Sequence, residues 1–284
     1  HSVRRRTNYR CIVLFEHDLG CLEEIIQNVM AMKFRWQLLM LMCILGQFHA
    51  LHAQKTVMED RQAWLGVFSQ YRFSDRWGMW SDVHFRLKND FVQKPSQFIL
   101  RVGPTFYLTD DVRLTTAYNF INHFPDEAHK NISQPEHRLM QQVQWFTKIK
   151  QARLMQWVRL EERWRKKILN DDELGEGFNF NWRIRYNFGL FIPLSKKGLA
   201  PGGFQLLIND ELMVNMGENI VYNYFDQNRL FLGLVYQTNS HAHVQLGYMN
   251  VFQQLAAGNR YREQHVIRLF YFHNFDFRKS EEKH

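Results

Sequence analysis

Apolar and polar side chains alternate with a period of two over most of the chain, and this period is typical of β-strands. In the clearest stretch, residues 178–190, seven apolar or aromatic side chains occupy one face, while asparagine, arginine and glycine occupy the other. A strand of about a dozen residues is long enough to cross a bilayer at a tilt. Soluble barrels usually have shorter strands with apolar side chains inside. The pattern therefore predicts long strands that each carry one face suited to lipid.

Ten other segments repeat the alternation, which makes eleven in all. The segments are residues 63–73, 79–88, 98–108, 112–120, 138–145, 154–165, 178–190, 204–214, 229–237, 244–252 and 267–276. They predict an all-β fold, a single antiparallel transmembrane up-and-down β-barrel of about 10–12 strands. Because a closed antiparallel barrel needs an even number of strands, we expect that one segment is missing from this set or split in two.

The connections between these segments alternate in length. The short ones fall at residues 74–75, 109–111, 148–151 and 238–241, and the long ones at 89–96, 122–135, 167–177, 216–226 and 253–262. Short periplasmic turns and long external loops are typical of outer-membrane barrels. This alternation predicts that the last strand ends in the periplasm. The same alternation places Gln62, just before the first predicted segment, on the external side of the membrane unless a further strand lies within residues 54–62.

Residues 32–53 have the features of a secretory signal peptide. Lys33 begins a short basic region, and an apolar run follows at residues 38–45. This run is too short for a helix that spans a membrane, but it has the length of a signal-peptide core. Ala53 then provides a small-residue exit. We therefore expect cleavage before Gln54.

The signal peptide divides the chain into three parts. Residues 1–31 are expected to be a non-native or mis-called extension, because Met32 is a plausible initiator; a genuine pre-sequence is the alternative. Residues 54–284 are expected to form the outer-membrane β-barrel. All three cysteines precede this part, so the mature chain would hold no disulfide and no cysteine-bound metal. The net charge of +8 comes from mixed signs spread along the chain, which does not indicate a nucleic-acid partner.

The predicted polar faces carry many charged side chains, most of them arginines. The residues expected to line the lumen are Arg101, Arg113, Arg138, Arg159, Arg163, Arg183, Arg185, Arg229, Arg268, Asp82, Glu161 and Glu211. One interpretation is a salt-bridged plug that fills a narrow barrel. The other is a cation-lined passage that selects anions. Both predict a non-enzymatic role, either structural or as a minor channel that prefers anions.

Aromatic residues lie near the ends of several segments, where a membrane barrel carries its interfacial girdles. The residues expected in these girdles are Trp64, Trp77, Tyr107, Trp164, Tyr236 and Phe275. A soluble periplasmic β-barrel that binds an apolar ligand is the main alternative. It predicts the reverse distribution, with apolar side chains inside the barrel and polar side chains on its exterior.

An outer-membrane acyl hydrolase is the enzymatic alternative. It needs a serine, a histidine and an orienting carboxylate or amide close together. Ser81 and His84 are the nearest such pair in sequence, but an offset of three places them on opposite faces of a strand. His241 and His243 fall in a predicted turn, without a third ligand close in sequence. The sequence therefore predicts no catalytic residue, no metal site and no cofactor.

Three segments resemble a family of outer-membrane barrels of unknown function from Gram-negative bacteria of the Bacteroidetes type. They are the part of the first strand around Trp64, the run Phe225-Asp226-Gln227-Asn228-Arg229 that leads into the strand at residues 230–236, and the run Leu246-Gly247-Tyr248-Met249-Asn250. The resemblance covers the whole mature chain and implies a β-barrel in the bacterial outer membrane. It implies contact with outer-membrane lipid and lipopolysaccharide and insertion by the barrel-assembly machinery. The family has no settled activity, so the resemblance implies no functional residue.

Overall fold

Residues 55–127, 129–198 and 200–278 are described by the computed structural model, and they form eleven β-strands. The strands are β1 (Thr56–Arg72), β2 (Trp77–Lys88), β3 (Lys94–Tyr107), β4 (Val112–His123), β5 (Gln134–Ile149), β6 (Ala152–Ile168), β7 (Leu174–Pro193), β8 (Phe204–Met216), β9 (Phe225–Gln237), β10 (Ala242–Gln254) and β11 (Arg260–Asp276). Each predicted segment coincides with one strand, so the predicted all-β barrel is confirmed. The predicted extension, residues 1–31, and the predicted signal peptide, residues 32–53, lie outside the described residues. In the described part of the chain, no helix is long and apolar enough to cross a membrane.

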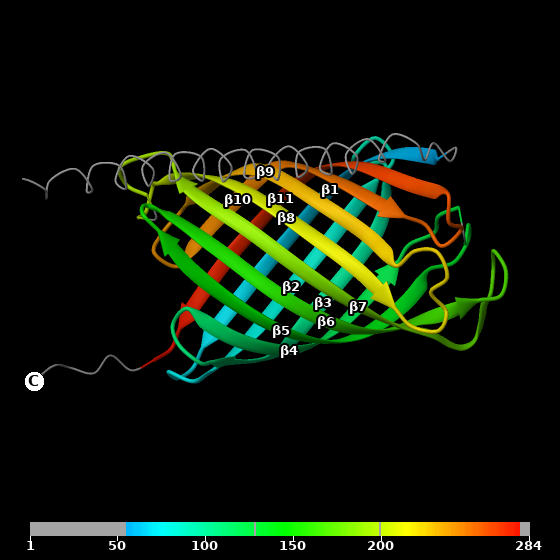
Figure 1. Cartoon of the computed structure of the whole chain (residues 1–284), viewed down its shortest axis with the longest axis horizontal. Coiled ribbons are helices and arrows are strands. Elements are labelled where there is room, and N and C mark those ends of the chain that lie inside the picture. Colours follow the sequence, from blue (N-terminus) through cyan, green and yellow to red (C-terminus); the bar gives the residue numbers. More distant parts are fainter. Residues whose placement is uncertain (1–54, 128, 199, 279–284) are drawn as a thin grey trace, which may run out of the picture. The chain divides into compact units, whose positions relative to one another are not determined.

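The strands close into a barrel in which neighbours in sequence are neighbours in space (Figure 1). Every pair is antiparallel except the last one, because β1 and β11 pair in parallel from Thr56 opposite Arg260 to Arg72 opposite Asp276. The expected even strand number is wrong, since no predicted segment is missing or split in the described residues. When an odd number of strands alternate in direction, the first and the last run the same way. Only a parallel pairing then closes the barrel.

The two ends of the barrel have different connections. The end at which β1 begins, here called the loop end, carries residues 89–93, 124–133, 169–173, 217–224 and 255–259. The opposite end, here called the turn end, carries residues 73–76, 108–111, 150–151, 194–203 and 238–241, and β11 finishes there. All predicted short turns are at the turn end, where residues 194–203 form a long connection that the sequence did not predict. No strand precedes β1 in the described residues, and Gln62 lies within β1.

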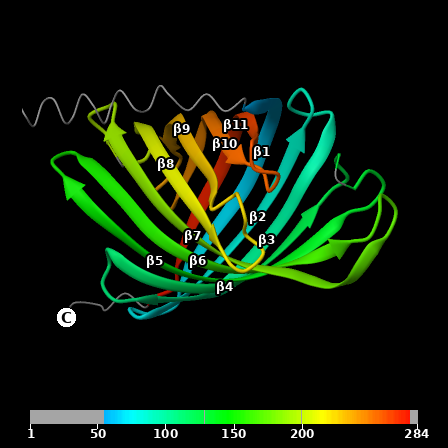
Figure 2. The same cartoon turned by 45° about the vertical axis from the view of Figure 1, so that its right-hand side comes forward.

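The outward face of the barrel is apolar along most strands. In β9, the side chains of Leu230, Leu232, Leu234 and Tyr236 are all exposed. The strands are inclined in the same sense around the barrel, as closure requires (Figure 2). Since side chains alternate along each strand, the outward rows from adjacent strands combine into a continuous apolar surface.

The inward face is polar on most of its area but includes one apolar wall. This wall consists of Trp64, Leu207, Phe231, Val235, Met249, Val251, Val266 and Phe270, contributed by β1 and β8–β11. The rest of the inner wall consists of glutamines, asparagines, arginines and carboxylates, many of them buried from solvent. The barrel therefore has a mostly polar and charged interior and a mostly apolar exterior, with Glu162 and Asp210 as charged residues on the outward face.

Candidate functional site: the charged interior

The interior contains one large cavity of about 1600 Å³ among the described residues. All eleven strands contribute side chains to its wall. The lining also includes Asp126 and Leu255 at the loop end, and Asp110 and His241 at the turn end. The cavity therefore extends along the barrel from one end toward the other.

Nearly all the charged residues that the sequence assigns to the lumen border this cavity. Its lining includes Arg101, Arg113, Arg138, Arg159, Arg163, Arg183, Arg185, Arg229, Arg268, Glu161 and Glu211. Asp82 is buried behind it, where its Oδ1 accepts a hydrogen bond of 2.7 Å from Nε of Arg101. Strand alternation is sufficient to place these residues, because each shares its inward face with the neighbours two positions away.

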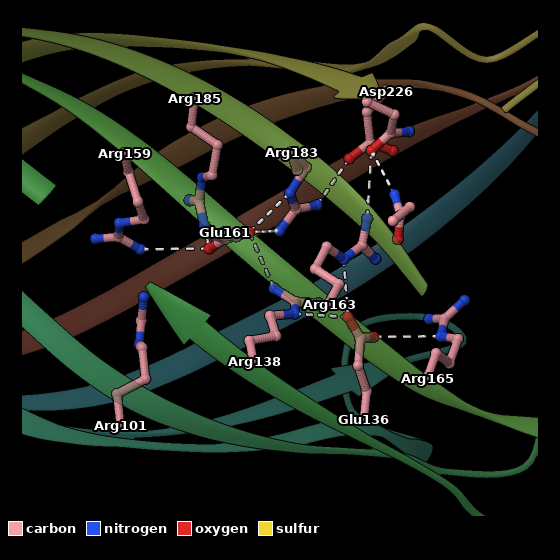
Figure 3. Close-up of polar contacts among 12 residues, drawn as sticks. Arg101, Glu136, Arg138, Arg159, Glu161, Arg163, Arg165, Arg183, Arg185 and Asp226 are labelled. Carbon is pink, nitrogen blue, oxygen red and sulfur yellow. Dashed lines mark hydrogen bonds and ion pairs between the residues drawn. The ribbon is translucent and has the colours of Figure 1, made fainter. Parts of the chain in front are cut away.

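Glu161 of β6 is the centre of one ion-pair cluster (Figure 3). Its Oε2 accepts a hydrogen bond of 2.8 Å from Nε of Arg183, and its Oε1 accepts one of 2.7 Å from Nη1 of Arg185. Nη1 of Arg138 lies 3.5 Å from Oε2. Both carboxylate oxygens are thus engaged by guanidinium groups from two neighbouring strands, β5 and β7. Such charge-assisted bonds keep a buried carboxylate ionised.

Glu136 of β5 is the centre of a second cluster, nearer the loop end (Figure 3). Its Oε1 accepts hydrogen bonds of 2.6 Å from Nε of Arg138 and 2.8 Å from Nε of Arg163. Its Oε2 lies 2.8 Å from Nε2 of His123 and 3.2 Å from Nε of Arg165. Arg138 also approaches Glu161, so the two clusters are continuous.

Two further carboxylates complete this network. Asp226 Oδ2 accepts a hydrogen bond of 2.7 Å from Nη1 of Arg183. Glu211 Oε1 accepts one of 2.7 Å from Nε of Arg185, and its Oε2 lies 3.6 Å from Nη1 of Arg229. Four carboxylates and their arginines therefore link strands β5 to β9 across the inner wall.

Sequence reasoning missed two of the four carboxylates in the network, Glu136 and Asp226. Glu136 could have been found, because it continues the inward alternation two residues before Arg138, but the predicted segment began too late. Asp226 could not be found in this way. The pairing of β8 with β9 is irregular between Met213 and Val214, and both Asp226 and Gln227 are buried as a result. A bulge changes the side-chain alternation of the strand, and the sequence around Asp226 does not predict it.

Arginines outnumber acids in this interior. The acids that line the cavity or are buried beside it are Glu59, Asp60, Asp82, Asp110, Asp126, Glu127, Glu136, Glu161, Glu211, Asp226 and Asp276. The basic residues that line it are Arg72, Arg86, Arg101, Arg113, Arg138, Arg153, Arg159, Arg163, Arg165, Arg183, Arg185, Arg229, Arg262, Arg268, Lys88, Lys94 and Lys130. Of the described ion pairs, none involves Arg86, Arg113 or Arg268. The cavity wall therefore carries an excess of positive charge.

Aromatic rings support several of these arginines. The guanidinium carbon of Arg86 lies 3.5 Å from the ring centroid of Trp64, and that of Arg268 lies 3.4 Å from the ring centroid of Phe231. The guanidinium of Arg159 lies 4.6 Å from the ring of Trp157. Stacking of this kind offsets part of the cost of burying a cation, and it holds the guanidinium group in a fixed position.

The expected aromatic girdle is wrong for two of its members. Trp64 is only 3% exposed and points inward, where its Nε1 donates a hydrogen bond to Gln62. Tyr107 is also buried inside, 4.3 Å from the guanidinium of Arg72. Both residues share the inward face with polar neighbours two positions away, so the alternation of their strands places them in the lumen.

The other four aromatic residues assigned to the girdle are on the outward face. Trp77 and Tyr236 are exposed, near the turn end. Trp164 is half-buried against Phe180, with ring centroids 5.2 Å apart, and Phe275 is half-buried against its neighbours on β1 and β11. Their position at a membrane interface remains a prediction.

The histidines of the interior are held by polar partners. His84 Nε2 lies 2.9 Å from Asp82 Oδ1 and 2.7 Å from Nη2 of Arg101, whereas Ser81 faces outward on the same strand. His243 is stacked on Phe272, and its partner in sequence, His241, is in the connection to β10. Within the described residues, no three potential metal ligands come together.

The fold and its interior define a class of protein, a closed β-barrel with an apolar exterior and a network of buried charges. The chain belongs to the family described as "Protein of unknown function (DUF2490)", whose family model matches residues 61–262, from β1 into β11. The predicted membership in a family of unknown function is therefore confirmed. Neither a curated protein nor a solved structure matches the chain.

Proposed function

We propose that this protein is a bacterial outer-membrane β-barrel whose arginine-rich interior favours the passage of small anions. The observation that carries the proposal is the distribution of side chains, apolar outside and charged inside. A barrel in water buries its apolar side chains, because each Å² of apolar surface left in water costs about 25 cal/mol. A barrel in a bilayer has lipid around it and water or polar groups within it.

The outward face supports a membrane location in preference to a soluble periplasmic barrel. Outward leucines such as Leu230, Leu232 and Leu234 are about half exposed. The soluble alternative has one supporting feature, the apolar wall around Phe231, which suits an apolar ligand. That wall does not explain an apolar exterior, whereas a surrounding bilayer does.

The interior supports an anion passage in preference to a complete plug. The cavity of about 1600 Å³ has lining residues at both ends of the barrel. Arginines exceed acids along it, so a mobile cation would be repelled and a mobile anion attracted. The same excess argues against a purely structural role, because a plug of salt bridges would be most stable with its charges balanced.

We further propose that the protein acts without a catalytic step. The buried histidines are occupied by carboxylates and arginines, as for His84 with Asp82 and His123 with Glu136. Among the described residues, no hydrogen bond joins a serine hydroxyl to a histidine. An acyl hydrolase would need such a pair near the outer rim.

Two experiments test the proposal in sequence. In the first, membranes from a Gram-negative host that expresses the full chain are washed with concentrated urea. An integral barrel stays in the membrane and migrates differently on a gel before and after boiling, whereas a soluble or peripheral protein is released. In the second, the purified protein is reconstituted in a planar bilayer under a potassium chloride gradient. Discrete conductance steps with a reversal potential that indicates chloride preference support the passage. An inserted protein that stays silent supports the structural role instead.

A further inference from the structure

Three residues in one row of the inner wall link β2, β1 and β11. Trp64 of β1 is paired in register with Arg86 of β2 on one side and with Arg268 of β11 on the other. The row therefore crosses the parallel seam and places one arginine on each side of Trp64. All three side chains line the cavity.

Trp64 holds a fixed position in this row. Its Nε1 donates a hydrogen bond of 2.7 Å to Oε1 of Gln62, which fixes the orientation of the ring. The guanidinium of Arg86 lies 3.5 Å from the ring centroid, and that of Arg229 from β9 lies 5.0 Å from the same centroid. Arg268 is opposite Trp64 in the register of β11 on β1. Three arginines from three strands thus gather on one part of the wall.

Arg268 is held on the same wall by stacking on the ring of Phe231. Its guanidinium lies 3.4 Å from the ring centroid of Phe231, which in turn packs on two glycines of β9 and β10. A Cβ atom at Gly233 would lie 2.4 Å from Cζ of Phe231, and one at Gly247 would lie 2.8 Å from it. Only glycine leaves room for the phenyl ring here, and the ring then presents the guanidinium to the cavity.

Two of these arginines have no carboxylate within 4.0 Å among the described residues, and Glu211 is the acid whose charge acts on Arg268 from farther away. Of the described carboxylates, none forms an ion pair with Arg86 or Arg268. Each donates one side-chain hydrogen bond to a neutral glutamine, Arg86 at 2.7 Å to Gln97 and Arg268 at 2.9 Å to Gln245. The Nε atoms of both are buried and have no hydrogen-bond partner. Arg268 is only 9% exposed, and burying a cation without an ion-pair partner is costly.

The third arginine has only a distant and shared carboxylate. Nη1 of Arg229 lies 3.6 Å from Glu211, which already accepts a hydrogen bond of 2.7 Å from Arg185. The positive charge of the three guanidinium groups is therefore largely uncompensated by protein. A multivalent oxyanion would supply both the missing negative charge and the acceptors that the free Nε–H groups require.

We propose that Arg86, Arg229 and Arg268 form a binding site for a phosphoryl dianion inside the barrel. Guanidinium groups recognise phosphoryl oxygens through pairs of parallel N–H bonds, and the rings of Trp64 and Phe231 hold two of these groups in place. The site deepens the proposed anion passage, because it names the class of anion that would be held there. The phosphoryl group comes either from free phosphate or from a phosphorylated lipid.

The test measures binding of inorganic phosphate to the full chain purified in detergent, by titration calorimetry at constant ionic strength. Arg86→Gln and Arg268→Gln are each expected to weaken phosphate binding about tenfold, since each removes a charge-assisted hydrogen bond. Arg113→Gln is the matched control. It removes another interior arginine that lacks an ion pair among the described residues, but one whose Nε and Nη2 both donate to Gln144. The control is expected to bind phosphate like the wild type.

A second titration, with short-chain phosphatidic acid, distinguishes the two sources of the phosphoryl group. Binding of phosphate alone indicates the free anion, binding of the lipid alone indicates a headgroup, and either result supports the site. The site is overturned if the wild type binds neither, or if the double variant of Arg86 and Arg268 binds as the wild type does. Should the glutamine variants fail to fold, Arg86→Lys and Arg268→Lys keep the charge and still lose the paired N–H bonds. They are then expected to bind several-fold more weakly, and wild-type affinity in both would overturn the site.

The calorimetric result is independent of conduction. If the protein binds phosphate but shows no conductance in a bilayer, the binding site is supported and the proposed passage is contradicted. If the protein conducts chloride but binds no phosphoryl group, the passage is supported and the binding site is contradicted.

Discussion

Phe68 of β1 stacks on Phe272 of β11, with ring centroids 4.3 Å apart and ring planes within 9° of parallel. The two residues are paired in register across the parallel seam. On the outward face, Tyr71 stacks on Phe275 in the same way, at 4.9 Å. Parallel pairing is slightly less stable per residue than antiparallel pairing. Ring contacts on both faces thus reinforce the pair of strands that closes the barrel.

The inward contact is expected to contribute more than the outward one, because Phe68 also packs on Phe270 and His84. Phe68→Ala should lower the free energy of unfolding by about 3 kcal/mol, as large-to-small changes in packed interiors do. Tyr71→Phe keeps the outward ring contact and should leave stability unchanged. Urea unfolding followed by tryptophan fluorescence measures both. Equal midpoints for Phe68→Ala and the wild type would contradict this account of the seam.

Glu161 neutralises more arginines than any neighbouring group. Glu161→Gln leaves Arg183 and Arg185 with one carboxylate fewer each, and breaking a buried ion pair costs about 3–5 kcal/mol. Glu218 is the matched control, because it is exposed in the connection between β8 and β9 and reaches water. Glu218→Gln should change stability by less than about 0.5 kcal/mol. The comparison is made on the fraction of protein that resists unfolding in urea. Similar effects of the two changes would mean that the interior network does not stabilise the barrel.

Gly233 is expected to tolerate no side chain. Gly233→Ala would bring Cβ within 2.4 Å of Phe231 Cζ and 2.6 Å of the backbone oxygen of Leu246. Overpacking of this kind costs about 1–3 kcal/mol. Gly175→Ala is the control, because its nearest contact would be 3.3 Å, to Cβ of Lys167. Thermal unfolding of the two variants should show a lower midpoint for Gly233→Ala only. An unchanged midpoint would show that Phe231 moves freely.

The sequence predicts the strands and their inward residues well, because side-chain alternation is a local property. The alternation of side chains along the strand is enough to place Arg183 and Arg185 in the lumen. The sequence does not predict which groups meet across the lumen. Arg183 bridges Glu161 on β6 and Asp226 on β9, and this contact depends on barrel curvature and on an irregular strand pair.

The parallel seam is a second feature that local patterns do not show. The sequence predicts all eleven strands, but the rule that an antiparallel barrel has an even number of strands does not predict how they close. Closure depends on the length and direction of every strand together. The register of β1 on β11, with Trp64 opposite Arg268, is therefore a property of the complete barrel.

The proposed membrane location predicts how an outward charge affects stability. Leu232 is 53% exposed and lies in the middle of β9. In a bilayer, Leu232→Arg should destabilise the protein by about 2–4 kcal/mol, because an arginine near the midplane must leave water. In a barrel surrounded by water, the same exposed substitution should cost less than about 0.5 kcal/mol. Unfolding in lipid vesicles, followed by gel migration before and after boiling, gives the difference.

Leu169→Arg is the control for this measurement, because Leu169 is 68% exposed and lies in the connection between β6 and β7. A charge there reaches water in either environment and should have no effect. If Leu232→Arg is as stable as Leu169→Arg in vesicles, lipid does not surround β9. The apolar exterior would then need a different partner. If only Leu232→Arg is destabilised, the leucine row of β9 faces hydrocarbon, and the side chains that alternate with it face the interior.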